Sequence, residues 1–369
     1  MSLVLVRLKE RTYPVYVQRG LLPRLGSLIK KQGLGGGHAL VVSQKQVTVY
    51  TETVVSESLA KEGFEFSFFT TPHTKSSEAA KSEAVFSKLV KRIASHDGKH
   101  KSIFLIALGG GVIGDLTGFA ASVYRRGIPY IQIPTTLTAQ VDSAIGGKTG
   151  IDLPEGKNLL GSIYQPKLVL MDSQLLDSLP ERHWSDGFAE VIKYGIIKDP
   201  ALFALLENEG KEGIKKSPRL LDKVIYRSAR IKAKIVEKDE WDKKGLRMIL
   251  NFGHTAGHAI EAASKFSRQY THGEAVAIGM LVACDIAEKL GVLKERSLTE
   301  RLEKTLMKFE LPLFYRGLGI DTLLKAIGYD KKSDRGSNRF VLPVASGKTA
   351  LVRDVPLSVI TESLEKRKN

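Results

Sequence analysis

Short apolar runs separated by amphipathic stretches make up most of the first half of the chain. Strands are predicted over residues 39–43, 64–70, 103–108, 130–133 and 167–171. Helical spacing of apolar residues is found between them, over 47–61 and 77–95. Because buried strands that alternate with helices form parallel sheets covered on both faces, we predict a mostly parallel, Rossmann-like α/β domain.

The period of the apolar residues changes near Pro180 and is helical from there on. Helices are predicted over 219–237, 256–266 and 274–290, followed by a strand over 339–343. A chain of 369 residues is expected to form two domains. We therefore predict an α/β domain over residues 1–177 and a mostly α-helical domain over 178–369.

Composition narrows the class of protein. The formal net charge is +16, but the basic residues are scattered and form no stripe with interleaved aromatics, which argues against nucleic acid as a partner. No segment has the length and apolar character of a membrane span or a signal peptide. The single cysteine, Cys284, excludes an internal disulfide framework and is predicted to be buried. These features predict a cytoplasmic protein.

Three potential metal ligands occur on separate segments: Glu190 in GFAEVIKYG, His254 in NFGHTAGHAIE and His272 in THGEAVAIGM. One carboxylate and two imidazoles are a ligand set that leaves a zinc ion open to water or substrate. Each residue alone is more typical of a satisfied core position than of a metal ligand, so the hypothesis depends on their occurring together.

A glycine-rich turn, Gly109–Asp115, follows the strand predicted at 103–108. Glycines between a strand and a helix allow a pyrophosphate to approach the backbone and the helix N-terminus. The turn follows a late strand, and no acidic residue lies about twenty positions on, so the motif departs from the usual dinucleotide fingerprint. A tight turn without a ligand remains the alternative.

Two further groups of polar residues suit an anionic ligand. Ile145–Gly150 resembles the end of a P-loop, although Asp142 stands where that motif needs glycine. Lys148 within this loop, the pair Lys157–Asn158 and the hydroxyls of Thr135 and Thr136 are candidate donors.

The helical half adds inward-facing polar residues. Lys193 shares a helix face with Glu190, and Asn251 and His258 share one with His254 if that stretch is helical. Lys232 lies on the apolar side of its helix, where snorkelling to solvent is favoured by the pattern and an inward cation is the alternative. Together, the candidate metal ligands, the glycine-rich turn and the candidate cations suggest metal- and nicotinamide-dependent chemistry on a small polyanion.

The chain resembles the 3-dehydroquinate synthase family from about residue 38 to 350. The motifs that carry the resemblance are GGGVIGDLTGFAAS, YRRG, IPTTLTAQVDSAIGGKTGID, GKNLLG, FAEVIKYG, LNFGHTAGHAIE and HGEAVAIGM. The resemblance implies a lyase of the shikimate pathway, which leads to chorismate and the aromatic amino acids. It implies conversion of 3-deoxy-D-arabino-heptulosonate 7-phosphate to 3-dehydroquinate and phosphate through transient oxidation, phosphate elimination, reduction and aldol cyclisation. NAD, zinc or cobalt, and a homodimer are implied with it.

The resemblance also implies roles for individual residues. Glu190, His254 and His272 would bind the metal. The NAD-binding residues would be Gln44, Glu78, Lys81, Gly110, Gly111, Val112, Asp115, Thr135, Thr136 and Lys157. The residues around the substrate would be Asp142, Lys148, Asn158, Lys193, Lys232, Arg247, Asn251 and His258, with Arg126 reaching the substrate of a neighbouring subunit. Either Lys331 or Lys332 would join the carboxylate pocket.

Two departures from the family pattern concern the cofactor. Gln44 stands where the family usually has an aspartate that holds the adenine ribose, which weakens the case for NAD over NADP. Ser77 replaces a glycine in the loop that contains Glu78 and Lys81. A related sugar-phosphate cyclase, such as a 2-deoxy-scyllo-inosose synthase, is the main alternative. A glycerol-dehydrogenase-like enzyme and a basic nucleic-acid-binding protein are the others.

Overall fold

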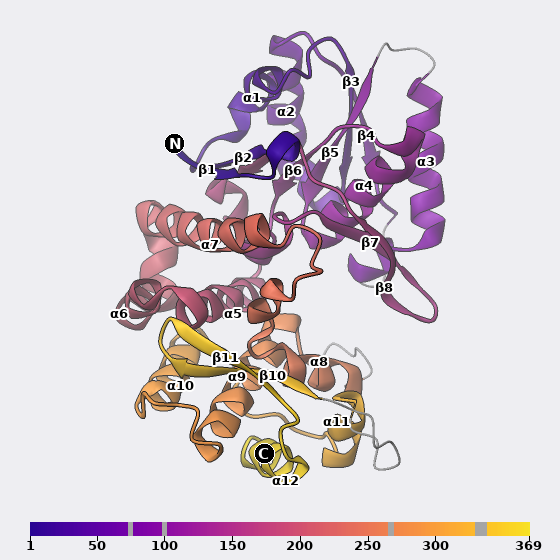
Figure 1. Ribbon diagram of the computed structural model, residues 1–369. Coiled ribbons are helices and arrows are strands. Elements are labelled where there is room, and N and C mark those ends of the chain that lie inside the picture. The colour runs from indigo at the N-terminus through magenta and orange to yellow at the C-terminus, as the bar shows by residue number, and fades with distance from the viewer. Residues whose placement is uncertain (73–76, 98–101, 265–268, 329–337) are drawn as a thin grey trace. The chain divides into compact units, whose positions relative to one another are not determined.

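The computed structural model describes residues 1–72, 77–97, 102–264, 269–328 and 338–369 (Figure 1). The chain forms two compact units. The first contains Met1–Leu179 and Ile225–Trp241, and the second contains Pro180–Val224 and Asp242–Asn369. The chain first passes from one unit to the other after Leu179, close to the predicted boundary. The predicted division into 1–177 and 178–369 does not include the return of Ile225–Trp241 to the first unit. The assignment of NAD to the first domain, and of metal and substrate to the second, stays a prediction.

A seven-stranded sheet forms the centre of the first unit, with the order β1-β2-β9-β6-β5-β3-β4. The antiparallel pair β1–β2 lies at one edge, and β2 and the other strands are joined by parallel pairings. The strands are β1 (Ser2–Val6), β2 (Tyr13–Val17), β3 (His38–Ser43), β4 (Glu65–Thr70), β5 (Ile103–Gly109), β6 (Tyr130–Pro134) and β9 (Leu168–Met171). The predicted mostly parallel sheet is confirmed.

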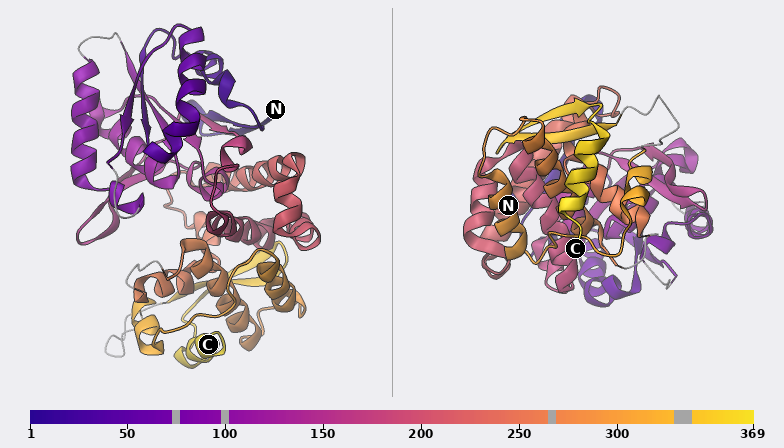
Figure 2. Two further views of the ribbon diagram at one scale, coloured as in Figure 1. Left: turned by 180° about the vertical axis from the view of Figure 1, so that it is seen from behind. Right: turned by 90° about the horizontal axis from the view of Figure 1, so that it is seen from below.

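Helices cover both faces of this sheet (Figures 1 and 2). One face packs on α1 (Leu25–Lys31) and α2 (Lys45–Lys61), and the other on α3 (Glu83–Asp97) and α4 (Gly111–Val123). Successive residues of a strand point to opposite faces, so Val41 of β3 joins the first core and Leu40 the second. This two-sided burial explains why the strands are apolar at nearly every position.

The loop predicted to bind an anion at Ile145–Gly150 is in part a strand. Lys148 begins β7 (Lys148–Leu153), which forms an antiparallel hairpin with β8 (Gly156–Ile163). Gly150 and Gly161 are paired, and a Cβ on Gly161 would lie 2.4 Å from the Thr149 carbonyl oxygen. Gly150 and Gly161 are therefore required by the close approach of two strands, and the anion-binding role of Lys148 stays a prediction.

The second unit is mostly helical. Its helices are α5 (Glu181–Lys198), α6 (Pro200–Lys216), α8 (His254–Ala263), α9 (His272–Lys289), α10 (Leu298–Lys308), α11 (Ile320–Ala326) and α12 (Leu357–Lys366), with a hairpin of β10 (Arg339–Ala345) and β11 (Lys348–Arg353). Helix α7 (Pro218–Lys238) belongs to the second unit up to Val224 and to the first from Ile225. Helix α9 is buried on every side from Ala275 to Ala287, and Cys284 within it is a buried free thiol, as predicted.

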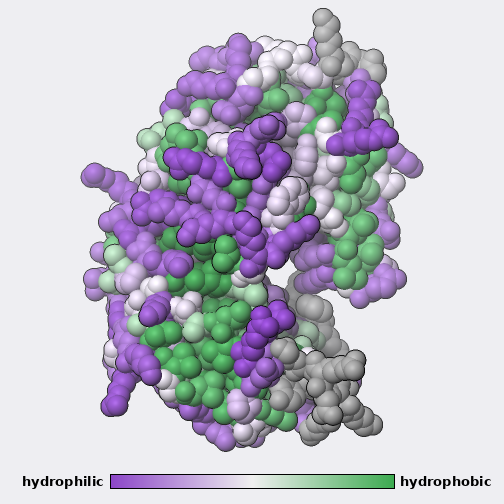
Figure 3. Space-filling view, in the orientation of Figure 1, coloured by the Kyte–Doolittle hydropathy of each residue, from purple (hydrophilic) through white to green (hydrophobic). Residues whose placement is uncertain are grey.

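Figure 3 shows hydrophilic side chains over much of the visible face, together with a broad hydrophobic area in its lower half. None of the helices in the described part of the chain combines the length and apolar character that crossing a bilayer requires.

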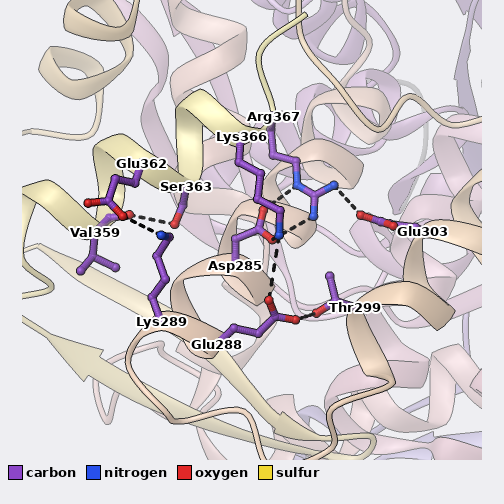
Figure 4. A network of polar contacts seen from close by, with 10 residues as sticks. All are labelled: Asp285, Glu288, Lys289, Thr299, Glu303, Val359, Glu362, Ser363, Lys366 and Arg367. Atoms are coloured by element: carbon purple, nitrogen blue, oxygen red, sulfur yellow. Dashed lines mark hydrogen bonds and ion pairs between the residues drawn. The ribbon is translucent and has the colours of Figure 1, made fainter.

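A buried ion-pair network holds the C-terminal helix against α9 (Figure 4). The Arg367 guanidinium donates to both Asp285 oxygens, at 2.5 and 2.9 Å, and to Glu303 at 2.6 Å. Lys366 adds a bond of 2.6 Å to Asp285. Arg367 and Asp285 are 2% and 1% exposed, so each charge depends on the other for its compensation.

We expect Asp285→Ala to lower the free energy of unfolding by about 3–5 kcal/mol, because it leaves a buried guanidinium without its main carboxylate. Lys304→Ala, in the exposed pair with Glu300, is the control and should cost about 0–1 kcal/mol. Denaturant titration followed by circular dichroism measures both. Equal losses in the two variants would show that the buried network does not stabilise the unit.

Candidate active-site residues

The structure brings Glu190, His254 and His272 together in the second unit. Glu190 lies on α5, His254 is the first residue of α8, and His272 is the first residue of α9. The Nε2 atoms of His254 and His272 approach the same oxygen, Glu190 Oε1, at 3.4 and 3.3 Å. Residues separated by more than eighty positions in the sequence therefore present three potential ligand atoms to one point.

These distances fit a divalent ion. At zinc–nitrogen and zinc–oxygen distances of about 2.0–2.1 Å and tetrahedral angles, neighbouring ligand atoms lie roughly 3.3 Å apart. Both Glu190 oxygens are fully buried, and neither accepts a hydrogen bond of normal geometry within the described residues. His254 Nδ1 lies 3.1 Å from the Phe252 carbonyl oxygen, which can only accept, so the proton resides on Nδ1 and the Nε2 lone pair is left for a ligand.

Close helix contacts fix the positions of the two histidines. A Cβ on Gly279 of α9 would lie 2.0 Å from the Gly253 carbonyl oxygen and 2.7 Å from the Gly257 nitrogen of the α8 segment. A Cβ on Gly273 would lie 2.3 Å from the Asp186 carbonyl oxygen of α5. Glycine at these places lets the three helices meet at the ends that carry the ligands.

Asp186 is a supporting residue that the sequence did not single out. Its carboxylate accepts from the Gly273 amide at the start of α9, one helical turn before Glu190 on α5. The only signal in the sequence was this one-turn spacing from Glu190, which by itself is typical of any helical carboxylate.

Charge in this cluster is compensated locally. Lys193 forms an ion pair with Glu190, and both side chains are 1% exposed. Burial opposes ionisation of Glu190, but Lys193 and His254 outweigh it and hold the pKa of this carboxyl well below its ordinary value. Partial desolvation, together with the neighbouring His254 and His272, lowers the pKa of His258 to about 4, although this residue is exposed at the surface.

The other predicted residues of the second unit lie on two different elements. His258 follows His254 by one turn of α8, and their ring centroids are 5.3 Å apart. Arg247 and Asn251 belong to a 3₁₀ helix, Leu246–Asn251, with Arg247 buried and Asn251 exposed. Gly253, in the left-handed region at φ 80°, separates this segment from α8, so the predicted single helical face for Asn251 and His254 is wrong. Lys331 and Lys332 lie outside the described residues.

In the first unit, the predicted cofactor residues follow the carboxyl ends of neighbouring parallel strands. Gln44 follows β3, Gly110 and Gly111 follow β5, and Thr135 and Thr136 follow β6. Strand β3 pairs with β4 on one side and β5 on the other, so the strand order of the parallel sheet reverses between β3 and β5. Ligands of open α/β sheets bind at such a switch point.

The glycine turn has the geometry of a close approach. Gly110 is the N-cap of α4, and a Cβ there would lie 3.1 Å from Thr136 Cγ2. A Cβ on Gly111 would lie 3.0 Å from Ser143 Oγ. Since the first turn of a helix presents backbone N–H groups, the turn offers an anion site beside the predicted Val112.

Lys81 connects three of the predicted residues. Its ammonium is 2.7 Å from Asp115 Oδ2, donates to Asn158 Oδ1, and lies 4.0 Å from Glu78. Although burial opposes charge on Lys81, Asp115 and Glu78 raise its pKa above the ordinary value. Asn158 is exposed on β8 beside the exposed Lys157 and has a φ of 56°.

Lys232 and Asp142 form a pair within the first unit. The distance from Lys232 Nζ to Asp142 Oδ1 is 2.5 Å, and Lys232 is 7% exposed. The snorkelling interpretation of Lys232 is therefore wrong, because its ammonium turns inward to a carboxylate. Lys148 is exposed at the start of β7, and Arg126 is exposed with a φ of 63°.

Comparison with known proteins gives consistent matches. The family models described as 3-dehydroquinate synthase N-terminal and C-terminal match residues 72–186 and 187–333. The 3-dehydroquinate synthase of Caldanaerobacter subterraneus subsp. tengcongensis is 43% identical over 95% of this chain and 97% of its own length. That of Nostoc punctiforme is 42% identical over 99% of both chains.

Solved structures give the same picture of the fold. A 2-deoxy-scyllo-inosose synthase complexed with carbaglucose-6-phosphate, NAD+ and Co2+ superposes with a TM-score of 0.86, at 25% identity over 99% of this chain and 100% of that chain. A 2-epi-5-epi-valiolone synthase from Streptomyces hygroscopicus with NAD+ and Zn2+ bound gives 0.84, at 30% identity over 98% of both chains.

The chain thus shares the fold of the dehydroquinate-synthase-like sugar-phosphate cyclases, an α/β unit with a mostly parallel sheet and a mostly helical unit. The chain belongs to the 3-dehydroquinate synthase family, whose members are carbon–oxygen lyases.

We expect the protein to bind one Zn2+ or Co2+ per chain. Glu190→Gln and His272→Ala should each weaken binding by more than the roughly 10–100-fold that loss of an outer-shell partner costs, since a ligand itself is removed. Isothermal titration calorimetry of the metal-free protein measures the affinity. His183→Ala, which removes an exposed histidine of α5, should bind as the unchanged protein does, and equal affinity in all of these proteins would place the metal elsewhere.

Proposed function

We propose that this protein is a 3-dehydroquinate synthase that converts 3-deoxy-D-arabino-heptulosonate 7-phosphate to 3-dehydroquinate and phosphate. The observation that carries the proposal is the convergence of Glu190, His254 and His272 at 3.3–3.4 Å, in a chain that matches relatives of this name over nearly its whole length. The geometry suits a metal that binds a substrate hydroxyl, and the relatives indicate which substrate carries it.

The cofactors would be NAD and zinc or cobalt, as in the two structural relatives that contain them. When bound, the metal would acidify a substrate hydroxyl and NAD would accept and return a hydride. Glu190, His254 and His272 would hold the metal. Gly110, Gly111 and Val112 would contact the pyrophosphate, with Thr135 and Thr136 on the nicotinamide side.

The charged residues would hold a doubly anionic substrate. Arg247 would bind the carboxylate, because a guanidinium fork matches two coplanar oxygens. Lys148, Asn158, Lys193 and His258 would hold the phosphate that departs. Fixing one conformation of a flexible chain is the main contribution of the remaining contacts.

The proposal also covers the location, the oligomeric state and the partners of the enzyme. It would act as a cytoplasmic homodimer, with Arg126 reaching the substrate phosphate of the neighbouring subunit. Arg126 is exposed, which is compatible with such a contact. The partner is a small phosphorylated sugar acid, and neither nucleic acid nor a membrane is required.

The alternative is a related cyclase such as a 2-deoxy-scyllo-inosose synthase, which the high TM-score of 0.86 favours. The 43% identity to a 3-dehydroquinate synthase, against 25% to that cyclase, supports the first assignment. The two enzymes differ in the charge of their substrates. A glucose 6-phosphate-like molecule, such as the carbaglucose-6-phosphate bound in that cyclase, has no carboxylate for Arg247.

We expect the protein with NAD and Co2+ to release inorganic phosphate from the heptulosonate phosphate, and much less from glucose 6-phosphate. Glu190→Gln should slow release roughly a thousandfold, because the charge stabilisation a metal supplies amounts to several kcal/mol. A coupled phosphate assay measures the rate, and the exposed Glu212→Gln is the control. Unchanged release by folded Glu190→Gln would contradict the proposal, and preference for glucose 6-phosphate would favour the alternative.

Gln44 allows a test of the choice between NAD and NADP. It is the N-cap of α2, but its side chain makes no capping hydrogen bond. Gln44→Asp should weaken NADP binding relative to NAD by about tenfold, because a carboxylate repels a 2′-phosphate and accepts from a 2′-hydroxyl. Gln46→Asp, an exposed position on α2, is the matched control. Calorimetric titration with both cofactors measures the ratio, and an equal ratio in the two variants would remove Gln44 from the ribose site.

A further inference from the structure

Glu261 lies beside the ring nitrogen of His272 that faces away from Glu190. The distance from Glu261 Oε2 to His272 Nδ1 is 3.2 Å, and the distance from His272 Nε2 to Glu190 Oε1 is 3.3 Å. The imidazole is thus held between two carboxylates, one at each nitrogen. Glu261 is not among the residues that the family resemblance implies.

The chemistry of the imidazole gives the two carboxylates different tasks. A histidine that binds a metal through Nε2 carries its proton on Nδ1, and a hydrogen bond from Nδ1–H to an acceptor fixes both tautomer and ring orientation. An ionised carboxylate only accepts, so Glu261 keeps the proton on Nδ1. The Phe252 carbonyl has the same task at His254, 3.1 Å from its Nδ1.

His272 has more need of such support than His254. The His272 side chain is 35% exposed, whereas that of His254 is 12% exposed, so packing restrains its ring less. Glu261 lies two turns after His254 on α8, and the glycine contact of α8 with α9 fixes its distance from the start of α9. The Glu261 side chain is itself only 17% exposed, which restricts its conformations.

We propose that Glu261 is a positioning residue that acts through His272, orienting its Nε2 towards a divalent ion. The inference rests on the metal site of the proposed function and adds a contact to it. One other arrangement uses the same side chains, because His258, Glu261 and His272 offer ligand atoms within 4.8 Å of one another. An ion held there through His272 Nδ1 would displace the proton that the first arrangement uses. Because Glu261 lies at Nδ1 and Glu190 at Nε2, the geometry favours orientation over ligation.

The test measures metal binding instead of turnover. Purified full-length protein is stripped of metal and titrated with Co2+, with affinity obtained by competition against a chromophoric chelator and coordination followed by the visible absorption of Co2+. The variants are Glu261→Ala and Glu261→Gln. The control is Glu300→Gln, a carboxylate that is 67% exposed on α10.

We expect one Co2+ per chain, with affinity about 10–100-fold weaker in Glu261→Ala, as for the loss of other outer-shell partners of metal-binding histidines. Glu261→Gln keeps an acceptor oxygen at the same distance, so it should lose less affinity than Glu261→Ala and retain the absorption spectrum of the unchanged protein. Because glutamine is close to glutamate in shape, a measurable loss of Co2+ affinity in Glu261→Gln still reports the lost carboxylate charge if Glu261→Ala does not fold. The Glu300→Gln protein should match the unchanged protein.

The outcomes separate the two proposals. If the unchanged protein binds no Co2+, the metal site and the proposed function fail together. If it binds Co2+ and both Glu261 variants bind with the same affinity and spectrum, the role of Glu261 alone is wrong. Two ions per chain in the unchanged protein and one in Glu261→Ala would make Glu261 a ligand and would likewise overturn its positioning role.

Discussion

The contact of α9 with the α8 segment is the constraint on which the second unit depends. Gly257 and Gly279 bring the two backbones into direct contact, and Gly253 leaves room for the Met280 side chain beside them. Each helix begins with a histidine, and a shift along either axis would carry that histidine away from Glu190. Since backbone contacts vary less than side-chain contacts, ligand separation is set by the least deformable part of the unit.

Helix α9 connects three features of the second unit. Its first turn faces the ligands, its middle forms the core, and Asp285 near its end receives the buried Arg367. One helix thus connects the candidate chemistry to the C-terminal ion-pair network. The first unit is organised differently, because its candidate residues follow the ends of separate strands and depend on the register of the sheet.

The sequence predicted those features that periodicity or residue chemistry controls, including the parallel sheet, the helical second half and the grouping of Glu190 with two histidines. It did not predict β1, β2 or the hairpin of β7 and β8, in which Gly150 and Gly161 let the two strands approach closely. The ion pair of Lys232 and the break at Gly253 also escaped prediction, because each depends on tertiary contacts or on a backbone conformation that spacing does not encode.

Cys284 has a practical consequence. It is the only cysteine of the chain, it is fully buried in α9, and burial raises the pKa of its thiol. A thiol that is neither accessible nor ionised reacts slowly with maleimides and methanethiosulfonates. Cysteines introduced at exposed positions, one in each unit, would therefore accept spin labels or fluorophores with little labelling of Cys284. The separation of the two units could then be followed in solution as ligands are added.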